Sequence, residues 1–417
     1  MTTIGSLGDL HPYIALALEM KKRYIEPVIA TSNAFRDRIE SLGIEFHPIR
    51  PVMPEAGTPE FLQMVDGVVD PNHGAEYLFK RMLVPAVRGM YHDLMSAIKG
   101  ADLLVTHSIV LAGPLVAQKT GIPWISTVLS PSSLWSAFDP FVPPNAPWLH
   151  RVLTFFGPSA ASAYQKFIKL VTNPWLVELY EFREDLGLPP GGHPLFEGQF
   201  SPTLTLALFS SVLAAPQPDW PRNVLVTGFV FYNGLEALQP ELDRFLNAGP
   251  PPVVFTLGTS AVAAAGRFYE ESVDAVRRLG IRAVLLTGGF EQNQPRGKVP
   301  SGVMLVDRAP HQLLFPRAAA VVHQGGAGTL GQALRAGKPM LVVPHAYDQP
   351  DNASRVTRLG VARTLRPRSY RGVRVARELG RLLSDSALAA RASEVATVVR
   401  AEGGARAAAA AIAAVSL

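Results

Sequence analysis

A histidine, a glycine-rich turn and an acid–amide pair lie within one stretch of the second half of the chain. The stretch reads HQGGAGTLGQALRAGKPMLVVPHAYDQ and runs from His323 to Gln349. Its glycines allow the backbone to approach a ligand closely, and the helix expected directly after them offers free N–H groups and a positive dipole end. Such a helix start favours phosphate, and a histidine at the end of the preceding strand can donate a hydrogen bond to the same group. The stretch therefore predicts a phosphate-binding turn.

Two classes of ligand fit this turn. Gly326, Gly328 and Gly331 spell G-x-G-x-x-G, the dinucleotide fingerprint, and Asp348 follows at about the distance of a ribose-binding acid. However, the pattern lies deep in the second half instead of on its first strand, and the fingerprint has no role for the histidine or for the amide of Gln349. A sugar nucleotide would use all of these groups, because a carboxylate beside an amide can bind adjacent hydroxyls. The dinucleotide interpretation stays as the minor alternative.

Composition and charge limit the class of protein. A chain of 417 residues is too long for one ordinary core, and its 48% of apolar residues can fill two. The net charge is +5, but the arginines are scattered, which argues against a nucleic-acid binder and is typical of a mildly basic enzyme. The absence of cysteine excludes disulfides and thiolate zinc sites.

The first residues of the chain and the length of its apolar runs indicate where in the cell the protein is expected. No apolar run reaches the roughly 20 residues that a bilayer requires, and the first twenty residues lack the pattern of a secretory signal. We therefore expect a cytoplasmic protein without stable membrane insertion, either a monomer or a weak dimer. The opening MTTIGSLGD begins at what looks like the end of a strand. We expect that the first half of this strand is missing, for example through an altered start site.

Short β-rich runs alternate with amphipathic stretches along nearly the whole chain, which predicts parallel sheets covered by helices. In the first half, strands are expected at residues 2–5, 26–32, 44–49, 101–108, 123–130 and 203–210, and a helix over 11–23. In the second half, they are expected at 251–260, 281–289, 302–309, 319–326, 338–346 and 361–367. Proline-rich segments at about 51–75 and 131–150 are expected to be long loops.

The fold class that follows is α/β, with two Rossmann-like doubly wound domains that face each other across a cleft. We expect an N-terminal domain over residues 1–215, an interdomain linker over 216–250, a C-terminal domain over 251–400 and a terminal helix over 401–417. The strand carboxyl ends of both domains would line the cleft, which is where ligands bind in this class of fold.

The two motifs together resemble a known family. The stretch from His323 to Thr329, its continuation AGKPMLVVP and the closing Asp348–Gln349 resemble the donor signature of the GT-B nucleotide-sugar glycosyltransferases of family one. The N-terminal GSLGDLHPYIALA is similar to the opening of the same family, especially its bacterial members that modify antibiotics, sterols and phenolics. The resemblance therefore covers both halves of the chain and implies a glycosyltransferase.

The resemblance also implies which residues bind the donor. His323 would contact one phosphate, the backbone of the turn would hold the other, and Asp348 and Gln349 would hydrogen-bond the sugar hydroxyls. The loop TLGTS after the first strand of the second domain would also face the phosphates. The donor-binding candidates are Gly258, Thr259, Arg308, His323, Gly325, Gly326, Ala327, Gly328, Thr329, Asp348 and Gln349. For the acid–amide pair, a solvated helix N-cap is the alternative interpretation.

Two positions depart from the pattern of the plant members. Arg308 stands where those members carry a tryptophan that stacks on the base, and a guanidinium can also stack. Gly331 stands where they carry a glutamate that binds the ribose. The missing carboxylate leaves room for a thymidine donor, which has no 2′-hydroxyl. The nucleotide is therefore expected to be UDP or dTDP.

Glycosyl transfer also needs a base that makes the acceptor hydroxyl nucleophilic. Asp9, expected at the tip of the first strand–helix turn and facing the cleft, is the first candidate, because many bacterial members carry an aspartate there. His11 is the rival, although a first-turn residue that faces solvent or caps the turn is the preferred interpretation for it. His107, at the end of its strand, could reach the acceptor, although strand-end histidines are more often structural.

The acceptor is expected to be small and hydrophobic. Four aromatic residues gather in the proline-stiffened segment SLWSAFDPFVPPNAPW, namely Trp135, Phe138, Phe141 and Trp148. They either pack under the loop or line a pocket for a flat acceptor. No cluster of metal ligands is apparent, and the family resemblance implies that neither a metal nor any cofactor beyond the sugar nucleotide is required.

The predicted function is an inverting transfer of a hexose, of glucose or rhamnose type, from a UDP- or dTDP-sugar to a hydroxyl of a flavonoid, another phenolic, a polyketide or a sterol. Inversion follows from the resemblance and from the single base. A sugar-nucleotide 2-epimerase shares the architecture and is the alternative, followed by an NAD(P)-binding oxidoreductase and by a sugar-nucleotide sensor with an inactive site.

Overall fold

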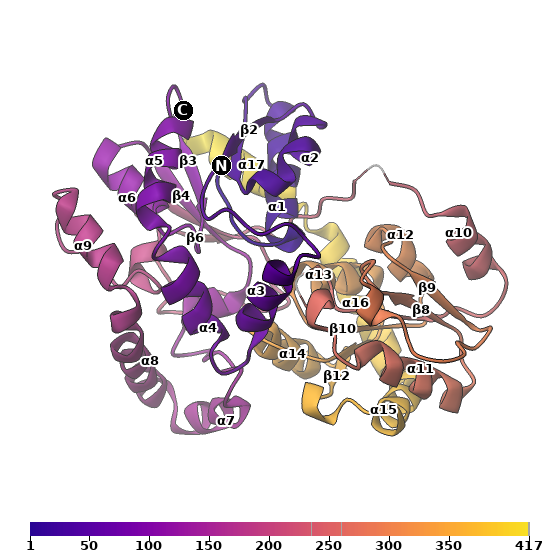
Figure 1. Cartoon of the computed structure of the whole chain (residues 1–417). Helices are drawn as coiled ribbons and strands as arrows, with labels where there is room; N and C mark the ends of the chain where they lie inside the picture. The colour runs from indigo at the N-terminus through magenta and orange to yellow at the C-terminus, as the bar shows by residue number, and fades with distance from the viewer. Residues whose placement is uncertain (235, 260, 416–417) are drawn as a thin grey trace. The chain divides into compact units, whose positions relative to one another are not determined.

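The structure, a computed structural model, describes residues 1–234, 236–259 and 261–415 (Figure 1). The chain divides into two compact units. The first unit contains Met1–Phe61, Asn72–Tyr232 and the C-terminal segment from Gly403, and the second contains Leu62–Pro71 and Asn233–Glu402. The main boundary, between residues 232 and 233, falls within the segment expected as a linker.

The first unit is built on a parallel sheet. Its strands are β1 (Val28–Thr31), β2 (Glu45–Pro48), β3 (Leu104–His107), β4 (Trp124–Val128), β5 (Leu204–Ala207) and β6 (Val224–Val226). They pair in the orders β1-β2 and β3-β4-β5-β6. Thr2 forms parallel bridges to Ala30 on β1 and to Thr106 on β3, and so joins the two groups. The strand expected over residues 2–5 is thus reduced to this bridging residue.

Helices cover this sheet. They are α1 (Leu7–Lys21), α2 (Arg36–Glu40), α4 (Gly74–Glu76), α5 (Val87–Ala97), α6 (Gly113–Thr120), α7 (Pro147–Phe156), α8 (Pro158–Thr172), α9 (Val177–Asp185) and α17 (Gly404–Val415), with a π-helical segment at Tyr77–Leu83. The alanines of α17 let it pack closely on α1, where Ala408, Ala409 and Ile412 share a core with Leu16 and Met20. The expected terminal helix is therefore present, and it belongs to the first unit; residues 416 and 417 lie outside the described part of the chain.

The second unit contains a six-stranded parallel sheet. Its strands are β7 (Val253–Thr256), β8 (Ala283–Leu286), β9 (Val303–Val306), β10 (Ala320–His323), β11 (Met340–Val342) and β12 (Ala362–Thr364). The order is β12-β11-β10-β7-β8-β9, which is the doubly wound order with its reversal between β10 and β7. The expected Rossmann-like topology is confirmed.

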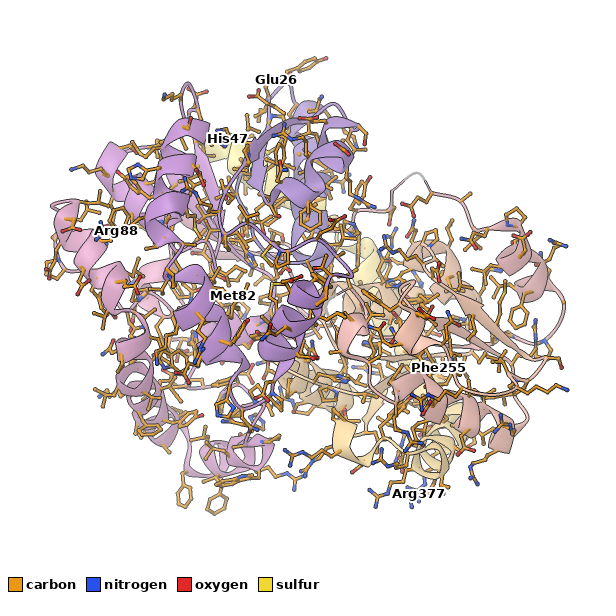
Figure 2. All side chains as sticks on the ribbon, viewed as in Figure 1. Glu26, His47, Met82, Arg88, Phe255 and Arg377 are labelled. Atoms are coloured by element: carbon orange, nitrogen blue, oxygen red, sulfur yellow. The ribbon has the colours of Figure 1, made fainter. Side chains whose placement is uncertain are left out.

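Helices also cover the second sheet. They are α10 (Pro240–Asn247), α11 (Phe268–Leu279), α12 (His311–Leu314), α13 (Ala327–Ala336), α14 (Gln349–Arg358), α15 (Gly372–Ser384) and α16 (Ser386–Ala401), and most of α3 (Pro59–Val69) is counted with this unit. Helices α11 and α15 lie side by side and share a core with the strands, in which Phe255 of β7 is 0% exposed (Figures 1 and 2).

Three segments expected to be irregular contain regular structure. Helix α3 lies in the segment 51–75, where Pro59 occupies its first position and Met64 and Val65 are buried. Proline is well tolerated at a helix start because the N–H that it lacks has no partner there. Helix α7 begins in the same way, at Pro147, within the segment 131–150. The expected linker 216–250 contains β6 and α10.

Candidate functional site

The topological switch of the second sheet lies between two glycine-bearing turns. Strands β10 and β7 are neighbours, and the strand order reverses between them. Chains leave the two carboxyl ends toward opposite faces of such a sheet, which opens a crevice for a ligand. His323 ends β10, and Gly258 lies two residues beyond the end of β7. The fold therefore brings two separately predicted motifs to one place.

The turn after β10 needs its glycines. Gly325 has φ +94°, and a Cβ added there would lie 2.9 Å from Val342 Cγ1 and 3.2 Å from the carbonyl oxygen of Gln349. Gly326 is the N-cap residue of α13 and has no side chain with which to cap the helix. Ala327, Gly328 and Thr329 then form the first helical turn, whose N–H groups lack partners within the helix. This uncapped start favours an anion.

The turn after β7 packs against the first. Gly258 has φ +66°, and a Cβ there would lie 2.3 Å from Gln324 Nε2 and 3.3 Å from Thr329 Oγ1. A Cβ on Gly326 would lie 2.9 Å from the same amide nitrogen. The buried side chain of Gln324 thus fits between two glycines, and any side chain at either position would displace it. Thr259 lies on the exposed side of this turn.

His323 is held as a neutral imidazole. Its side chain is fully buried, and burial lowers its pKa to about 3, with a smaller contribution from the nearby charge of His311. The N–H of Gly325 donates to Nδ1 at 3.0 Å, so the ring proton must be on Nε2. Within the described part of the chain, Nε2 is buried and has no hydrogen-bond partner. The strand end therefore presents an unused donor.

Asp348 and Gln349 lie at the start of α14. Asp348 occupies the N-cap position, but its side chain makes no capping bond; instead its Oδ2 accepts from Asn352 Nδ2 at 2.7 Å. The Oε1 of Gln349 accepts from the backbone N–H groups of His345 and Ala346, at 2.8 and 3.3 Å. Only the amide nitrogen of Gln349 is then left to donate to a ligand. A simple capping role does not explain Asp348.

Arg308 is less closely tied to this group. It lies just beyond β9, the edge strand that is separated from β10 by β7 and β8, and its side chain is exposed. In the described part of the chain, no hydrogen bond or ring contact joins it to the glycine turn. The structure thus brings together the candidates of both turns and of α14, and leaves Arg308 apart.

Asp9 lies within a helix and not at the tip of a turn, so the predicted position is corrected. It is the third residue of α1 and forms a capping box with Ser6. Its Oδ2 accepts from the backbone N–H of Ser6 at 2.8 Å and from Ser6 Oγ at 3.1 Å. Gly5 leaves space for this carboxylate, because a Cβ there would lie 2.4 Å from Oδ2. The second oxygen, Oδ1, is not used in the box.

His11 does not face solvent and does not cap the helix, contrary to the preferred interpretation of it. The residue is half-buried, and its ring lies 5.3 Å from that of Tyr232. Burial lowers the pKa of His11 to about 4, and the charge of Arg38 adds to this shift. Its Nε2 is buried without a partner among the described residues.

His107 lies at the switch of the first sheet, close to Asp9. It ends β3, beside the bridging segment of Thr2, and is 6% exposed. Thr3 Oγ1 and His107 Nδ1 are 3.3 Å apart. Burial lowers the pKa of His107, and the negative charge of Asp9 opposes this shift. The first unit thus places a carboxylate at the start of α1 near a buried imidazole at the end of β3.

The four aromatic candidates do not form a single cluster. Trp135 stacks on Phe196 at 4.2 Å and meets Phe141 edge-on at 4.7 Å. In contrast, Phe138 and Trp148 are 52% and 63% exposed. Trp135 and Phe141 therefore pack under the loop, because both rings contact other aromatic rings of the first unit.

Comparison with known proteins identifies the family. Residues 1–90 match the family model of the glycosyltransferase family 28 N-terminal domain, and residues 273–414 match the erythromycin biosynthesis protein CIII-like C-terminal domain. The chain is 32% identical over 429 residues to the O-mycaminosyltylonolide 6-deoxyallosyltransferase of Streptomyces fradiae, which covers 97% of this chain and 94% of that protein. The chain belongs to the GT-B glycosyltransferases of family one, of the antibiotic type.

Two further relatives agree with this assignment. The vancomycin aglycone glucosyltransferase of Amycolatopsis orientalis is 30% identical over 367 residues, which are 87% of this chain and 84% of that protein. The crystal structure of the glycosyltransferase VinC in complex with dTDP has the same fold, with a TM-score of 0.70, 21% identity and coverage of 100% of this chain and 98% of that one. The protein is a glycosyltransferase, and the epimerase alternative gains no support from these relatives.

Two further residues of this glycosyltransferase contribute to the site, although the sequence motif assigns them no role. Gln324 fills the space between the two turns. Asn352 donates to both Gly325 and Asp348. Its place four residues after Asp348 on a helix was the available signal, since such pairs face each other.

Membrane-spanning helices and clusters of metal ligands are both absent from the described residues. None of the helices there combines the length and the apolar composition that a membrane span requires. No group of three or more histidine, aspartate or glutamate side chains there could hold a metal ion.

Proposed function

We propose that this glycosyltransferase transfers a hexose, of glucose or rhamnose type, from a nucleoside diphosphate sugar to a hydroxyl of a small hydrophobic acceptor, with inversion at the anomeric carbon. Two relatives support the general class, since one is an O-mycaminosyltylonolide 6-deoxyallosyltransferase and the other a vancomycin aglycone glucosyltransferase. A polyketide, a phenolic or a sterol remains the acceptor class that we propose.

One observation carries the proposal for the donor. The buried Nε2–H of neutral His323 has no partner among the described residues, and it lies at the strand end that leads into the uncapped start of α13. An unpaired buried donor is costly, so such a group is expected to meet a ligand. A diphosphate supplies the acceptors that both features need, and it becomes the leaving group when the sugar is transferred.

The nucleotide that we propose is dTDP, with UDP as the second choice. Gly331 lies within α13 at the position where plant members of the family carry a ribose-binding glutamate. Without that carboxylate, the site has less to gain from a 2′-hydroxyl, which thymidine lacks. The structural relative VinC was solved with dTDP, which is consistent with this choice.

For the sugar, we propose that Asp348 and the amide nitrogen of Gln349 bind its hydroxyls. For the acceptor, we propose that Asp9 takes the proton of the attacking hydroxyl. The two hydrogen bonds from Ser6 fix the carboxylate and leave Oδ1 to act. A carboxylate can remove this proton as the hydroxyl becomes acidic in the transition state. His11 is the alternative base, and its low pKa of about 4 makes it a weak one.

A donor panel tests the proposal. The purified protein is incubated with dTDP-glucose, dTDP-rhamnose, UDP-glucose and UDP-rhamnose, each with and without a flavonoid, a polyketide aglycone or a sterol, and products are identified by mass spectrometry. We expect a glycoside only when an acceptor is present, and faster formation with a dTDP-sugar. Consumption of the donor without an acceptor would point to an epimerase, and a strong preference for uridine would refute the choice of nucleotide.

Two variants link the outcome to the site. His323→Ala should lower kcat/KM by about 100- to 1,000-fold, the usual loss for one donor to a developing negative charge. His92→Ala, which removes an exposed histidine of the first unit, is the control and should leave transfer unchanged. Equal activity of the two variants would contradict the assigned role of His323.

A further inference from the structure

Asn352 connects two parts of the candidate donor site. It lies on α14, one helical turn after Asp348, and is 1% exposed. Its Nδ2 donates to the carbonyl oxygen of Gly325 at 2.9 Å and to the Oδ2 of Asp348 at 2.7 Å. Because a carbonyl and a carboxylate can only accept, the amide nitrogen and not the amide oxygen must face them. One side chain therefore joins the glycine turn to the acid.

The connection continues to the histidine. Gly325 accepts from Asn352 through its carbonyl group, and its own N–H donates to His323 Nδ1 at 3.0 Å. Hydrogen bonds thus run from the carboxylate of Asp348 through Asn352 and Gly325 to the imidazole ring. At one end of this series of hydrogen bonds, the Nε2–H of His323 is a donor without a partner among the described residues, and at the other end the carboxylate of Asp348 is an acceptor. The spacing between these two groups depends on the amide in the middle.

We propose that Asn352 is a positioning residue that holds the acid of α14 in register with the glycine turn, so that the sugar and the diphosphate of one donor bind at the same time. The inference rests on the function proposed above for His323 and Asp348. It adds a specific consequence. A nucleoside diphosphate without a sugar needs only the glycine turn, whereas a nucleotide sugar needs both ends of the chain of hydrogen bonds.

Asn352→Leu tests the connection with a side chain of similar size that cannot donate. The substitution should weaken binding of the sugar part of the donor. The dissociation constant of dTDP-glucose should therefore rise by about 10- to 100-fold, the range for losing a hydrogen bond to a charged group. The dissociation constant of dTDP should change much less. Isothermal titration calorimetry measures both, with UDP-glucose and UDP in parallel, and thermal unfolding shows that the variant is folded.

Asn352→Asp adds a dependence on pH that a purely structural role would not produce. The introduced carboxyl would face Asp348 at hydrogen-bond distance, and two adjacent carboxylates raise the pKa of one of them. Above that pKa the two charges repel each other, and the connection is broken. Below it, the shared proton forms an O–H···O⁻ bond between the two carboxyl groups, which removes the repulsion and replaces the hydrogen bond to Asp348 but not the one to Gly325. The affinity of Asn352→Asp for dTDP-glucose, relative to wild type, should therefore recover in part from about pH 8 to about pH 5.

Other titratable groups near this position are the same in every variant. The ion pair of Asp351 with Arg355 lies on the same helix, buried, with its atoms 2.6 Å apart. Burial lowers the pKa of His345 in the preceding loop, and it lowers that of His323 on β10 to about 3, so His323 stays neutral over this range. Asn352→Leu carries these groups without the new carboxyl and should show no recovery, which makes it the matched control.

The outcomes separate this inference from the proposed function. If His323→Ala leaves the affinity for dTDP unchanged, the proposed donor site itself is wrong. If His323→Ala weakens dTDP and Asp348→Asn weakens dTDP-glucose, while Asn352→Leu and Asn352→Asp both bind dTDP-glucose as wild type does, only the role of Asn352 is refuted. Parallel pH profiles for Asn352→Asp and Asn352→Leu would refute it as well.

Discussion

At the scale of the residue, the charge of Asp9 can be removed without removing the hydrogen bonds that it accepts from Ser6. Asn at this position could still accept from Ser6 through its amide oxygen, so the start of α1 should be retained. We therefore expect Asp9→Asn to lose nearly all transfer while donor binding and thermal stability stay close to wild type. Initial rates and calorimetry measure the two effects. Residual activity close to wild type would assign the base elsewhere, and His11→Gln would then be the next variant to test.

The buried histidine of the second unit predicts how stability depends on pH. The pKa of His323 falls from 6.5 to about 3 on folding, so between these values the unfolded state binds a proton that the folded state does not. The free energy of unfolding should therefore decrease as the pH falls from 6.5 toward 3, by up to about 1.4 kcal/mol per pH unit from this group. In His323→Gln this contribution is absent.

Urea unfolding of both proteins across this range isolates the effect, because the carboxylates and the other histidines are common to both. The free energy of unfolding of the wild type, relative to that of His323→Gln, should decrease as the pH falls from 6.5 toward 3. Parallel curves of free energy against pH would mean that the imidazole of His323 is accessible to protons in the folded state.

At the scale of the element, two glycines with the same backbone conformation differ in their surroundings. Gly258 has φ +66° and lies against Gln324, whereas Gly280 has φ +62° at the end of α11 with nothing within 4 Å of an added Cβ. Gly280→Ala should cost about 1 kcal/mol of stability from the backbone alone. Gly258→Ala should cost more and should also weaken dTDP binding, because Gln324 must move. Equal effects of the two substitutions on dTDP binding would contradict this packing argument.

The helices and strands also show which parts of the fold can be predicted from the sequence. Apolar runs such as PPVVFTLG indicate the buried strands, and the composition of the glycine turn predicts its position. Helix α3 was missed because prolines before it suggest a loop, although Pro59 in fact begins the helix. Strand β6 has only three residues, too few for a periodic pattern. The contacts of Asn352 and Gln324 depend on which turns meet in three dimensions, which no local pattern encodes.

At the scale of the whole molecule, the end of the chain returns to the first unit. Ile412 of α17 is 0% exposed and packs in the core with α1. We expect Ile412→Ala to lower the free energy of unfolding of the first unit by about 2–5 kcal/mol, the range for deleting such a side chain from a core. Binding of dTDP by the second unit should be unaffected. Val398→Ala, at a 47% exposed position of α16, is the control and should change stability little.

This arrangement could not be obtained from the sequence alone. The alanine-rich segment after Gly403 predicts a helix, but its partner is more than 380 residues away, on α1. A small residue is required at the first position of α17, since a Cβ on Gly404 would lie 2.3 Å from the carbonyl oxygen of Phe229. The sequence reveals the helix, whereas only the three-dimensional structure reveals what it covers.

A crystal structure of the protein with dTDP would show directly whether the start of α13 binds the diphosphate. We expect diphosphate oxygens within hydrogen-bond distance of His323 Nε2 and of the backbone N–H groups of Ala327, Gly328 and Thr329. A well-ordered dTDP bound elsewhere, with no phosphate at the start of α13, would contradict it.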